Sequence, residues 1–350
     1  MAKRSARARL TSTHTLAYGI VAALLTGCVA ARGSVGRPVS TRIEDARYVS
    51  LGGIDQWITI RGDDVHRPIL LLLHGGPGDV QSPYVSAYAP YERHFVLVQW
   101  DQRGAGKTFA RYRDGTPDLT LDRVAKDGIE LAEYLHRRFK GNRIIVLGHS
   151  WGTAIGTVMV RTRAELFAAY VGTGQIASWA ESANAQFEFL KSKARETGNA
   201  AMVATFDSIG HLDPMNTAQY FAATRPLRNF MADSDKAWFS RMRALVKDSS
   251  GMTDDDLAAL DAGMSFSGRA LLPTQMREQL STYALRFKLP YFVIQGQDDW
   301  FVPTGPARSY FDKVVAPRKR MVVLEGTGHF ALVTHPDAFI AALENMLDAR

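Results

Sequence analysis

The fold is indicated most clearly by one short segment, Ile144-Ile145-Val146-Leu147-Gly148-His149-Ser150-Trp151-Gly152. Its four apolar residues indicate a short buried strand, and the residues from Ala154 onward continue with the pattern of a helix. A G-x-S-x-G motif between a strand and a helix is typical of a nucleophile elbow. Gly148 and Gly152 remove side chains that would collide in so sharp a turn. Ser150 is therefore predicted to be a nucleophile, presented above the edge of a sheet.

Apolar runs alternate with helical patterns on both sides of this stretch, which indicates βα units and a mostly parallel sheet. The run Ile69–Leu73 has no polar alternation, as expected for a strand that is covered on both faces. Leu121–Arg138 has the apolar spacing of a helix. Further strands are expected at residues 56–60, 95–99, 144–147, 169–172, 291–295 and 320–324, and a final helix at 336–347.

The stretch from residue 175 to residue 285 breaks this rhythm. It is rich in helical patterns and aromatic residues, and it contains no clear buried-strand run. We therefore expect a helical cap, inserted into an α/β core that consists of residues 46–174 and 286–350. Most aromatic side chains of the cap are expected to form its own core, and a minority to line a substrate cleft.

A serine hydroxyl becomes an effective nucleophile only when a base takes its proton, and the base needs an orienting acid. In folds with such an elbow, the acid and the histidine follow the serine along the chain. His329 follows the strand expected at 320–324 and is predicted to be the general base, whereas His335 precedes a proline at the start of the last helix. Asp298 and Asp299 follow the strand expected at 291–295, and position alone allows either to be the acid.

The loop His74-Gly75-Gly76-Pro77-Gly78 follows the strand at 69–73. Loops at this position donate a backbone N–H to the oxyanion of the tetrahedral intermediate, and glycines let the backbone approach the substrate closely. We expect the N–H groups of Gly76 and Trp151 to form the oxyanion hole, with Gly75 as an alternative to Gly76. One such donor is typically worth about 3 kcal/mol in the transition state. His74 is expected to brace the loop.

Taken together, these segments resemble the prolyl iminopeptidase-like family of α/β-hydrolases, serine peptidases that include proline iminopeptidases and tricorn-interacting aminopeptidases. The resemblance also includes Asp101–Thr108, which we interpret as structural support near the site. It implies an α/β-hydrolase fold: a mostly parallel central sheet flanked by helices, with an inserted helical cap. The family's Gly-x-x-Asp spacing favours Asp299 over Asp298 as the acid. The activity implied is cleavage of N-terminal aminoacyl or peptide bonds through an acyl-enzyme.

Aminopeptidases of this family hold the free amino terminus of the substrate with acidic residues of the cap. Four acids of the cap are candidates here, each of which would otherwise be a solvated helix carboxylate: Glu181, Glu188, Asp233 and Asp235. Residues 170–175 lack the arginine-containing turn of proline-specific members, so the resemblance implies amide or acyl hydrolysis without proline specificity. A carboxylesterase or lactonase that uses the same residues is the alternative. A second alternative is a lipoprotein that binds a ligand but has no catalytic activity.

The N-terminus has the features of a targeting segment. A basic start precedes the apolar run Leu16–Leu25, which at about ten residues is too short to span a membrane. The run ends in Leu25-Thr26-Gly27-Cys28, which resembles a bacterial lipoprotein signal. We expect residues 1–27 to be the signal peptide, Cys28 to be lipidated, and residues 28–45 to be a flexible tether. The enzyme would then lie in the bacterial cell envelope, facing outside the cytoplasm and touching the membrane through its lipid alone.

The charge and composition limit the partners. The chain of 350 residues has a formal net charge of +7, but Lys3, Arg4, Arg7 and Arg9 carry four of these charges. From residue 28 onward, 38 basic and 35 acidic residues leave +3, so no nucleic-acid partner is expected. The sequence has no cluster of ligands with metal spacing, and neither a metal nor another cofactor is expected. The expected partner is a small peptide or ester substrate.

Overall fold

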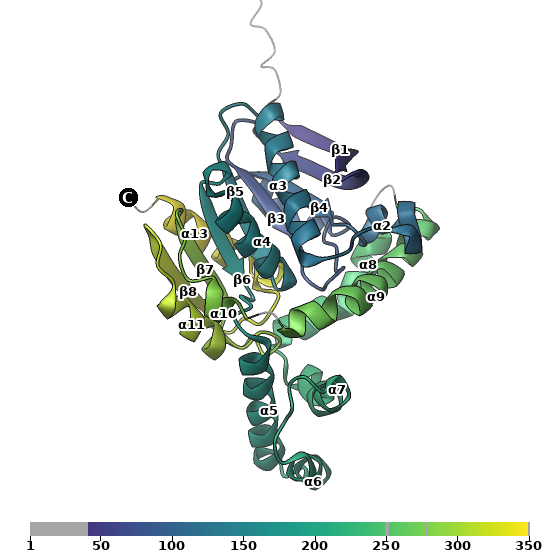
Figure 1. The fold of residues 1–350 in the computed structure, drawn as a ribbon, viewed down its shortest axis with the longest axis vertical. Coiled ribbons are helices and arrows are strands. Elements are labelled where there is room, and N and C mark those ends of the chain that lie inside the picture. The colour runs from purple at the N-terminus through teal and green to yellow at the C-terminus, as the bar shows by residue number, and fades with distance from the viewer. Residues whose placement is uncertain (1–40, 249–251, 278, 349–350) are drawn as a thin grey trace, which may run out of the picture. The chain divides into compact units, whose positions relative to one another are not determined.

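The computed structural model describes residues 41–248, 252–277 and 279–348. The predicted signal peptide, Cys28 and the first part of the predicted tether lie outside these ranges. Within them, one sheet of eight strands has the order β1-β2-β4-β3-β5-β6-β7-β8 (Figure 1). The strands are β1 (Ile43–Leu51), β2 (Ile54–Gly62), β3 (Ile69–Leu73), β4 (Val96–Asp101), β5 (Ile144–His149), β6 (Ala169–Thr173), β7 (Tyr291–Gly296) and β8 (Lys319–Leu324).

The direction of the strands brings the predicted site residues to one edge of the sheet. β1 pairs antiparallel with β2, and β2 with β4, whereas the remaining neighbours run parallel. Parallel strands all end at the same edge, where α/β proteins bind their ligands. Gly76, Ser150, Asp299 and His329 follow β3, β5, β7 and β8 respectively. These loops therefore lie at the carboxyl edge of the sheet.

Helices cover both faces of the sheet. The helices of the core are α1 (Val85–Glu92), α2 (Gly106–Tyr112), α3 (Leu121–Arg138), α4 (Trp151–Thr162), α11 (Thr304–Lys313), α12 (Ala331–Thr334) and α13 (Pro336–Asp348). Short 3₁₀ turns follow α2 and α4, at Arg113–Gly115 and Ala164–Leu166. Thr120 caps α3 by accepting a hydrogen bond from the N–H of Arg123 (3.1 Å), as helix N-termini require.

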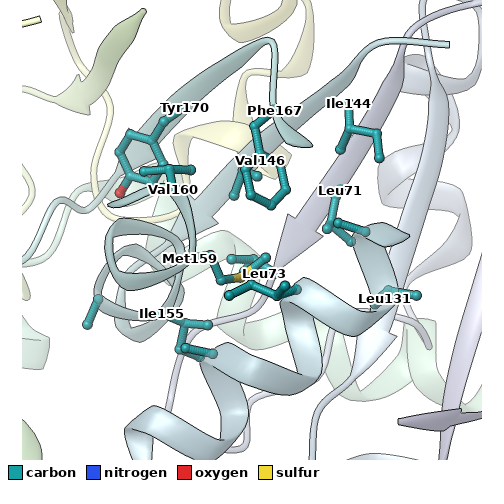
Figure 2. Packing of buried hydrophobic residues seen from close by; sticks show 14 of the residues in the cluster. Leu71, Leu73, Leu131, Ile144, Val146, Ile155, Met159, Val160, Phe167 and Tyr170 are labelled. Carbon is teal, nitrogen blue, oxygen red and sulfur yellow. The ribbon is translucent and has the colours of Figure 1, made fainter. Parts of the chain in front are cut away.

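The alternation of side chains along β3 explains its unbroken apolar run. Successive residues of a strand point to opposite faces of the sheet. Leu71 and Leu73 belong to the cluster that includes Leu131 of α3 and Met159 of α4 (Figure 2). Leu70 and Leu72 belong to the cluster on the other face, with residues of α1 and α13. Both sets are fully buried, so a polar residue at any of these positions would lose its hydration without gaining a partner.

Between β6 and β7, the described chain is helical. The helices of this cap are α5 (Trp179–Glu196), α6 (Ala200–Ile209), α7 (Thr217–Thr224), a 3₁₀ helix (Arg225–Phe230), α8 (Asp233–Asp248), α9 (Asp254–Arg277) and α10 (Leu280–Tyr283). Phe187, Phe206 and Tyr220 are buried in a separate cluster formed by α5–α7. This agrees with the expectation that aromatic residues mainly build the cap's own core. Phe221, in contrast, is 52% exposed.

The predicted fold class is confirmed, and the N-terminal boundary needs a correction. The sequence assigned residues 28–45 to a tether, but β1 begins at Ile43. Residues 43–45 are therefore strand, paired with residues 60–62 of β2. β1 lies at the edge of the sheet and carries several charged residues, so it lacks the apolar run that revealed the central strands. No helix in the described part of the chain is both long and apolar enough to span a membrane.

Candidate active site

Ser150 occupies the sharp turn between β5 and α4. Its backbone has φ 53° and ψ −119°, a strained conformation for a residue with a side chain. The Ser150 N–H donates to Thr173 O (2.9 Å), which ties the turn to the end of β6. A Cβ at Gly148 would lie 2.7 Å from Gly152 O, and one at Gly152 would overlap Leu73 O. The close backbone packing thus requires both glycines of the motif. Ser150 itself remains partly exposed.

His329 and Asp299 form a hydrogen-bonded pair at the ends of β8 and β7. His329 Nδ1 lies 2.8 Å from Asp299 Oδ2, and Asp299 is only 1% exposed. Gln295 Nε2 and the Val302 N–H also donate to the Asp299 carboxylate, at 3.1 Å and 2.8 Å. Because a carboxylate accepts hydrogen bonds, the Nδ1–H of His329 donates to it and Nε2 is left to accept a proton. The adjacent Asp298 is partly exposed, so the structure pairs His329 with the acid that the family spacing favoured.

Contacts between neighbouring residues place the His329 ring beside the elbow. Gly174 follows Thr173, whose carbonyl accepts from the Ser150 N–H. A Cβ at Gly174 would lie 2.7 Å from His329 Cε1. The rings of His149 and His329 have centroids 4.7 Å apart. Among the residues that the structure describes, no hydrogen bond joins the Ser150 hydroxyl to the His329 ring. Such bonds are often long without substrate and shorten when the substrate binds.

The loop after β3 lies against the serine. A Cβ at Gly75 would be 3.1 Å from Ser150 Cβ, so this loop passes directly beside the nucleophile. Gly76 has φ 107°, and a Cβ there would lie 2.6 Å from two backbone nitrogens, so the turn needs glycine. In the described residues, neither the Gly76 N–H nor the Trp151 N–H has a protein acceptor. The described protein thus leaves both predicted oxyanion donors without an internal acceptor.

His74 braces this loop. Its Nδ1 lies 2.9 Å from Gly75 O, and its Nε2 accepts from the Gln102 N–H at 3.4 Å. Burial lowers the pKa of His74 to about 4, so the ring is neutral at pH 7 and can donate from one nitrogen and accept at the other. These contacts describe a structural residue, as the sequence suggested.

The Asp101–Thr108 stretch supports the same loops from the end of β4. Asp101 accepts hydrogen bonds from Ser82 Oγ (2.6 Å) and from the Lys107 N–H (2.8 Å). Arg103 Nε donates to Asp127 Oδ2 of α3 at 2.8 Å, and both side chains are buried. A buried ion pair of this kind is costly to break, because either partner alone would be an uncompensated charge.

The charges around His329 control its protonation. Burial alone lowers the pKa of His329, but the negative charges of Asp299, Asp235 and Asp79 act against it, and the net effect raises the pKa above its ordinary value. His149 also faces the ring, and burial keeps its own pKa well below the ordinary value. His329 is therefore a stronger base than a free histidine, which suits proton abstraction.

The four acids of the cap differ in their exposure to solvent. Glu181, Glu188 and Asp233 are exposed. Asp235 is only 1% exposed, and its carboxylate accepts from the backbone N–H groups of His329 (2.7 Å) and Phe330 (3.2 Å). The sequence did not reveal this contact, because the two partners are 94 residues apart and no local pattern connects them.

Asp79, which follows the glycine loop, was also missed. Its N–H donates to Gly75 O (3.2 Å), so it belongs to the same turn as Gly76. Burial raises the pKa of the Asp79 carboxyl to about 6, while the charge of His329 acts in the opposite direction. In the part of the chain that the structure describes, this carboxylate has no hydrogen-bond partner. The site thus contains one acidic group that the protein itself leaves unpaired.

Two cavities lie beside the loop that carries Asp299. One, of about 570 Å³, is bordered by Phe189, Lys193 and Trp300 among others, and the second measures about 450 Å³. Neither is lined by Ser150 or His329. Phe189 and Trp300 stack with ring centroids 3.6 Å apart. The second cavity is lined by Asp299, so it borders the candidate site without containing the proposed nucleophile and base.

An elbow serine, a histidine–carboxylate pair and a glycine loop at one sheet edge are the features of an α/β-hydrolase site. The family model described as "alpha/beta hydrolase fold" matches residues 68–336, which is more than half of the chain. The chain therefore belongs to the α/β-hydrolase family and is a hydrolase.

The chain is also similar to individual proteins of this fold. "Probable aminopeptidase YbaC" of Bacillus subtilis (strain 168) is 26% identical over 313 residues, which cover 87% of this chain and 97% of that protein. A "Proline iminopeptidase" of Lactobacillus helveticus (strain DPC 4571) is 23% identical over 303 residues, 85% of this chain and 95% of its own. The crystal structure of the "proline iminopeptidase-related protein TTHA1809" from Thermus thermophilus matches with a TM-score of 0.61 at 21% identity, covering 87% of this chain and 97% of its own. The predicted resemblance to proline iminopeptidases is confirmed.

Proposed function

We propose that the protein is a serine hydrolase that cleaves N-terminal aminoacyl or peptide bonds through an acyl-enzyme. The observation that carries this proposal is the hydrogen bond between His329 Nδ1 and Asp299 Oδ2, on loops that flank the strained elbow of Ser150. The pair leaves Nε2 of His329 as the group that takes the serine proton. The names of the three similar proteins reported above support an aminopeptidase, although a thermophilic esterase from Thermogutta terrifontis has a similar fold as well.

In the first half-reaction, Ser150 Oγ bonds to the substrate carbonyl carbon while His329 Nε2 takes the hydroxyl proton. The carbonyl electron pair moves onto oxygen, and the N–H groups of Gly76 and Trp151 stabilise that oxyanion. Asp299 stabilises the imidazolium by accepting from its Nδ1–H. When the tetrahedral intermediate collapses, the C–N bond breaks, and His329 gives its proton to the leaving amine.

In the second half-reaction, water replaces the amine. His329 takes a proton from the water as its oxygen bonds to the acyl carbon, and the same N–H groups hold the second oxyanion. Collapse of this intermediate breaks the bond to Ser150 Oγ, which recovers its proton from His329. The acid product leaves, and the enzyme returns to its starting state.

The unpaired carboxylate of Asp79 supports a substrate with a free amino terminus. The residue is partly exposed and its carboxylate has no hydrogen-bond partner in the described residues, so a cationic ligand beside it could pair with its charge. An ammonium group next to the scissile carbonyl, as in an aminoacyl amide, has the matching charge and location. A neutral ester would leave Asp79 without a partner.

The test compares three substrates at equal concentration: alanyl-p-nitroanilide, N-acetyl-alanyl-p-nitroanilide and p-nitrophenyl acetate. We expect cleavage of the free aminoacyl amide and a large loss on acetylation, because acetylation removes the ammonium. Ser150→Ala should lower kcat by about a millionfold on any cleaved substrate. Activity confined to the ester would contradict the aminopeptidase and favour a carboxylesterase or lactonase. Full activity of Ser150→Ala would contradict both.

We also propose that the enzyme is anchored to the bacterial cell envelope through a lipid on Cys28 and faces outside the cytoplasm. The support is the sequence of the N-terminal segment, in which a basic start and a short apolar run precede Cys28, the chain's single cysteine. Cys28 lies outside the described residues, so this proposal rests on sequence alone.

A further inference from the structure

The peptide groups around His329 are held from two sides by distant parts of the chain. On the amide side, Asp235 of α8 accepts from the His329 N–H at 2.7 Å and from the Phe330 N–H at 3.2 Å. On the carbonyl side, His149 Nε2 of the elbow lies 3.1 Å from His329 O. The cap thus holds one side of the loop that carries the candidate base, and the elbow holds the other.

The elbow's contact is neutral. Since a carbonyl oxygen only accepts, His149 must carry its proton on Nε2, and Nδ1 then accepts from Gln81 Nε2 at 3.1 Å. Burial keeps the pKa of His149 well below its ordinary value, so both contacts persist in the uncharged ring. The only charged group among these contacts is the carboxylate of Asp235.

Asp235 is held where its charge acts on the loop. It lies in the first turn of α8, where the helix N-terminus favours a negative charge. None of the ion pairs in the described residues includes it. A side chain on Gly328 would overlap its carboxylate, so the loop approaches Asp235 as closely as a backbone can. Burial of a carboxylate without a cationic partner is costly, and its two backbone hydrogen bonds offset part of that cost.

We propose that Asp235 is a positioning residue, through which cap helix α8 fixes the loop of His329 and electrostatically stabilises the imidazolium formed during catalysis. The inference rests on the proposed role of His329 as general base. The other charged and titratable groups that face His329 are Asp299, Asp79 and His149. Asp299 orients the ring through Nδ1, whereas Asp235 holds the backbone that carries the ring.

The experiment measures kcat and kcat/KM against pH for Asp235→Asn, on the substrate that the wild-type enzyme cleaves best. An asparagine can accept one of the two N–H groups, but its amide nitrogen opposes the other. We expect kcat to fall about 10- to 100-fold, the cost of a small misplacement of a reacting group. Loss of the negative charge should also lower the pKa of His329, so the acidic limb of the profile should move to lower pH.

Asp233→Asn is the matched control. It removes the same charge from the same turn of α8, but its side chain is 97% exposed and pairs with Lys236 on the surface (3.0 Å). We expect its profile and kcat to match the wild type. Asp235→Glu keeps the charge but displaces it, so it should lower kcat while leaving the acidic limb in place. Gly328→Ala places a methyl group where the Asp235 carboxylate lies, so it should displace that carboxylate and lower kcat in the same way.

The outcomes separate this inference from the proposed function. An Asp235→Asn enzyme with unchanged kcat and an unchanged acidic limb would overturn the positioning role, provided that His329→Ala is inactive. Active His329→Ala would instead overturn the proposed function itself. If Asp235→Asn does not fold, the decision passes to Asp235→Glu and Gly328→Ala, because wild-type kcat in both variants contradicts the proposal and reduced kcat supports it.

Discussion

Asp298 and Asp299 are adjacent carboxylates whose surroundings differ completely. Asp299 is buried and accepts three hydrogen bonds, from His329, Gln295 and the Val302 N–H. Asp298 is partly exposed and lines the larger cavity. Residue order along the chain could not choose between them, because both follow the same strand. The family spacing favoured Asp299, and hydrogen bonding supplies the physical reason.

Neutralising each aspartate in turn tests this difference at the residue scale. Asp299→Asn should lower kcat about 10⁴-fold, because an amide can donate to Nδ1 and so favour the wrong tautomer of His329. Asp298→Asn should change kcat by less than about threefold, since surface changes of this kind are nearly neutral. Steady-state kinetics of the two variants, with circular dichroism to confirm folding, decides the point. A larger loss in Asp298→Asn would reverse the assignment.

The elbow is the element that the sequence predicted most completely. A strand, a motif with two glycines and a helix are local features, so their pattern is visible in one short stretch. β1 was missed because its charged, half-exposed residues have no apolar run. The contact between α8 and the His329 loop was missed for another reason: it joins residues 94 positions apart. Local patterns predict elements, whereas contacts of this length depend on how the elements pack.

Gly152 tests the packing of the elbow against its neighbouring strand. In Gly152→Ala, the added methyl group would overlap Leu73 O of β3, and neither backbone segment can yield easily. We expect the free energy of unfolding to fall by about 3 kcal/mol. The matched control is Gly268→Ala in α9, where a Cβ meets no atom within 4 Å. That variant should gain about 0.5 to 1 kcal/mol from higher helix propensity. Urea unfolding curves measure both; equal stability of the two variants would contradict the packing argument.

At the scale of the whole molecule, the charge is unevenly distributed along the chain. Four basic residues precede the apolar run at 16–25, whereas the chain from residue 28 onward is nearly neutral. This arrangement is the basis of the proposal that the N-terminal segment is a lipoprotein signal. The described sheet begins with β1 at Ile43, after these residues in the sequence.

The proposed anchor at Cys28 and the hydrolase activity are predicted to be separable. In Cys28→Ser, we expect the protein to leave the membrane fraction, because the lipid attachment site is lost, while kcat changes by less than about twofold. Fractionation of cells followed by an activity assay measures both effects. Retention of the variant in the membrane fraction would count against lipidation.

The role of Ser150 as the activated nucleophile is tested most directly by covalent labelling of the folded protein with a fluorophosphonate. Mass spectrometry of the labelled peptide then identifies the modified serine. A fluorophosphonate reacts with a serine only where a base and an oxyanion hole activate it. We predict a single label on Ser150, with labelling abolished in Ser150→Ala and slowed in His329→Ala. A folded wild-type protein that stays unlabelled at Ser150, or carries the label on another serine, would contradict the account.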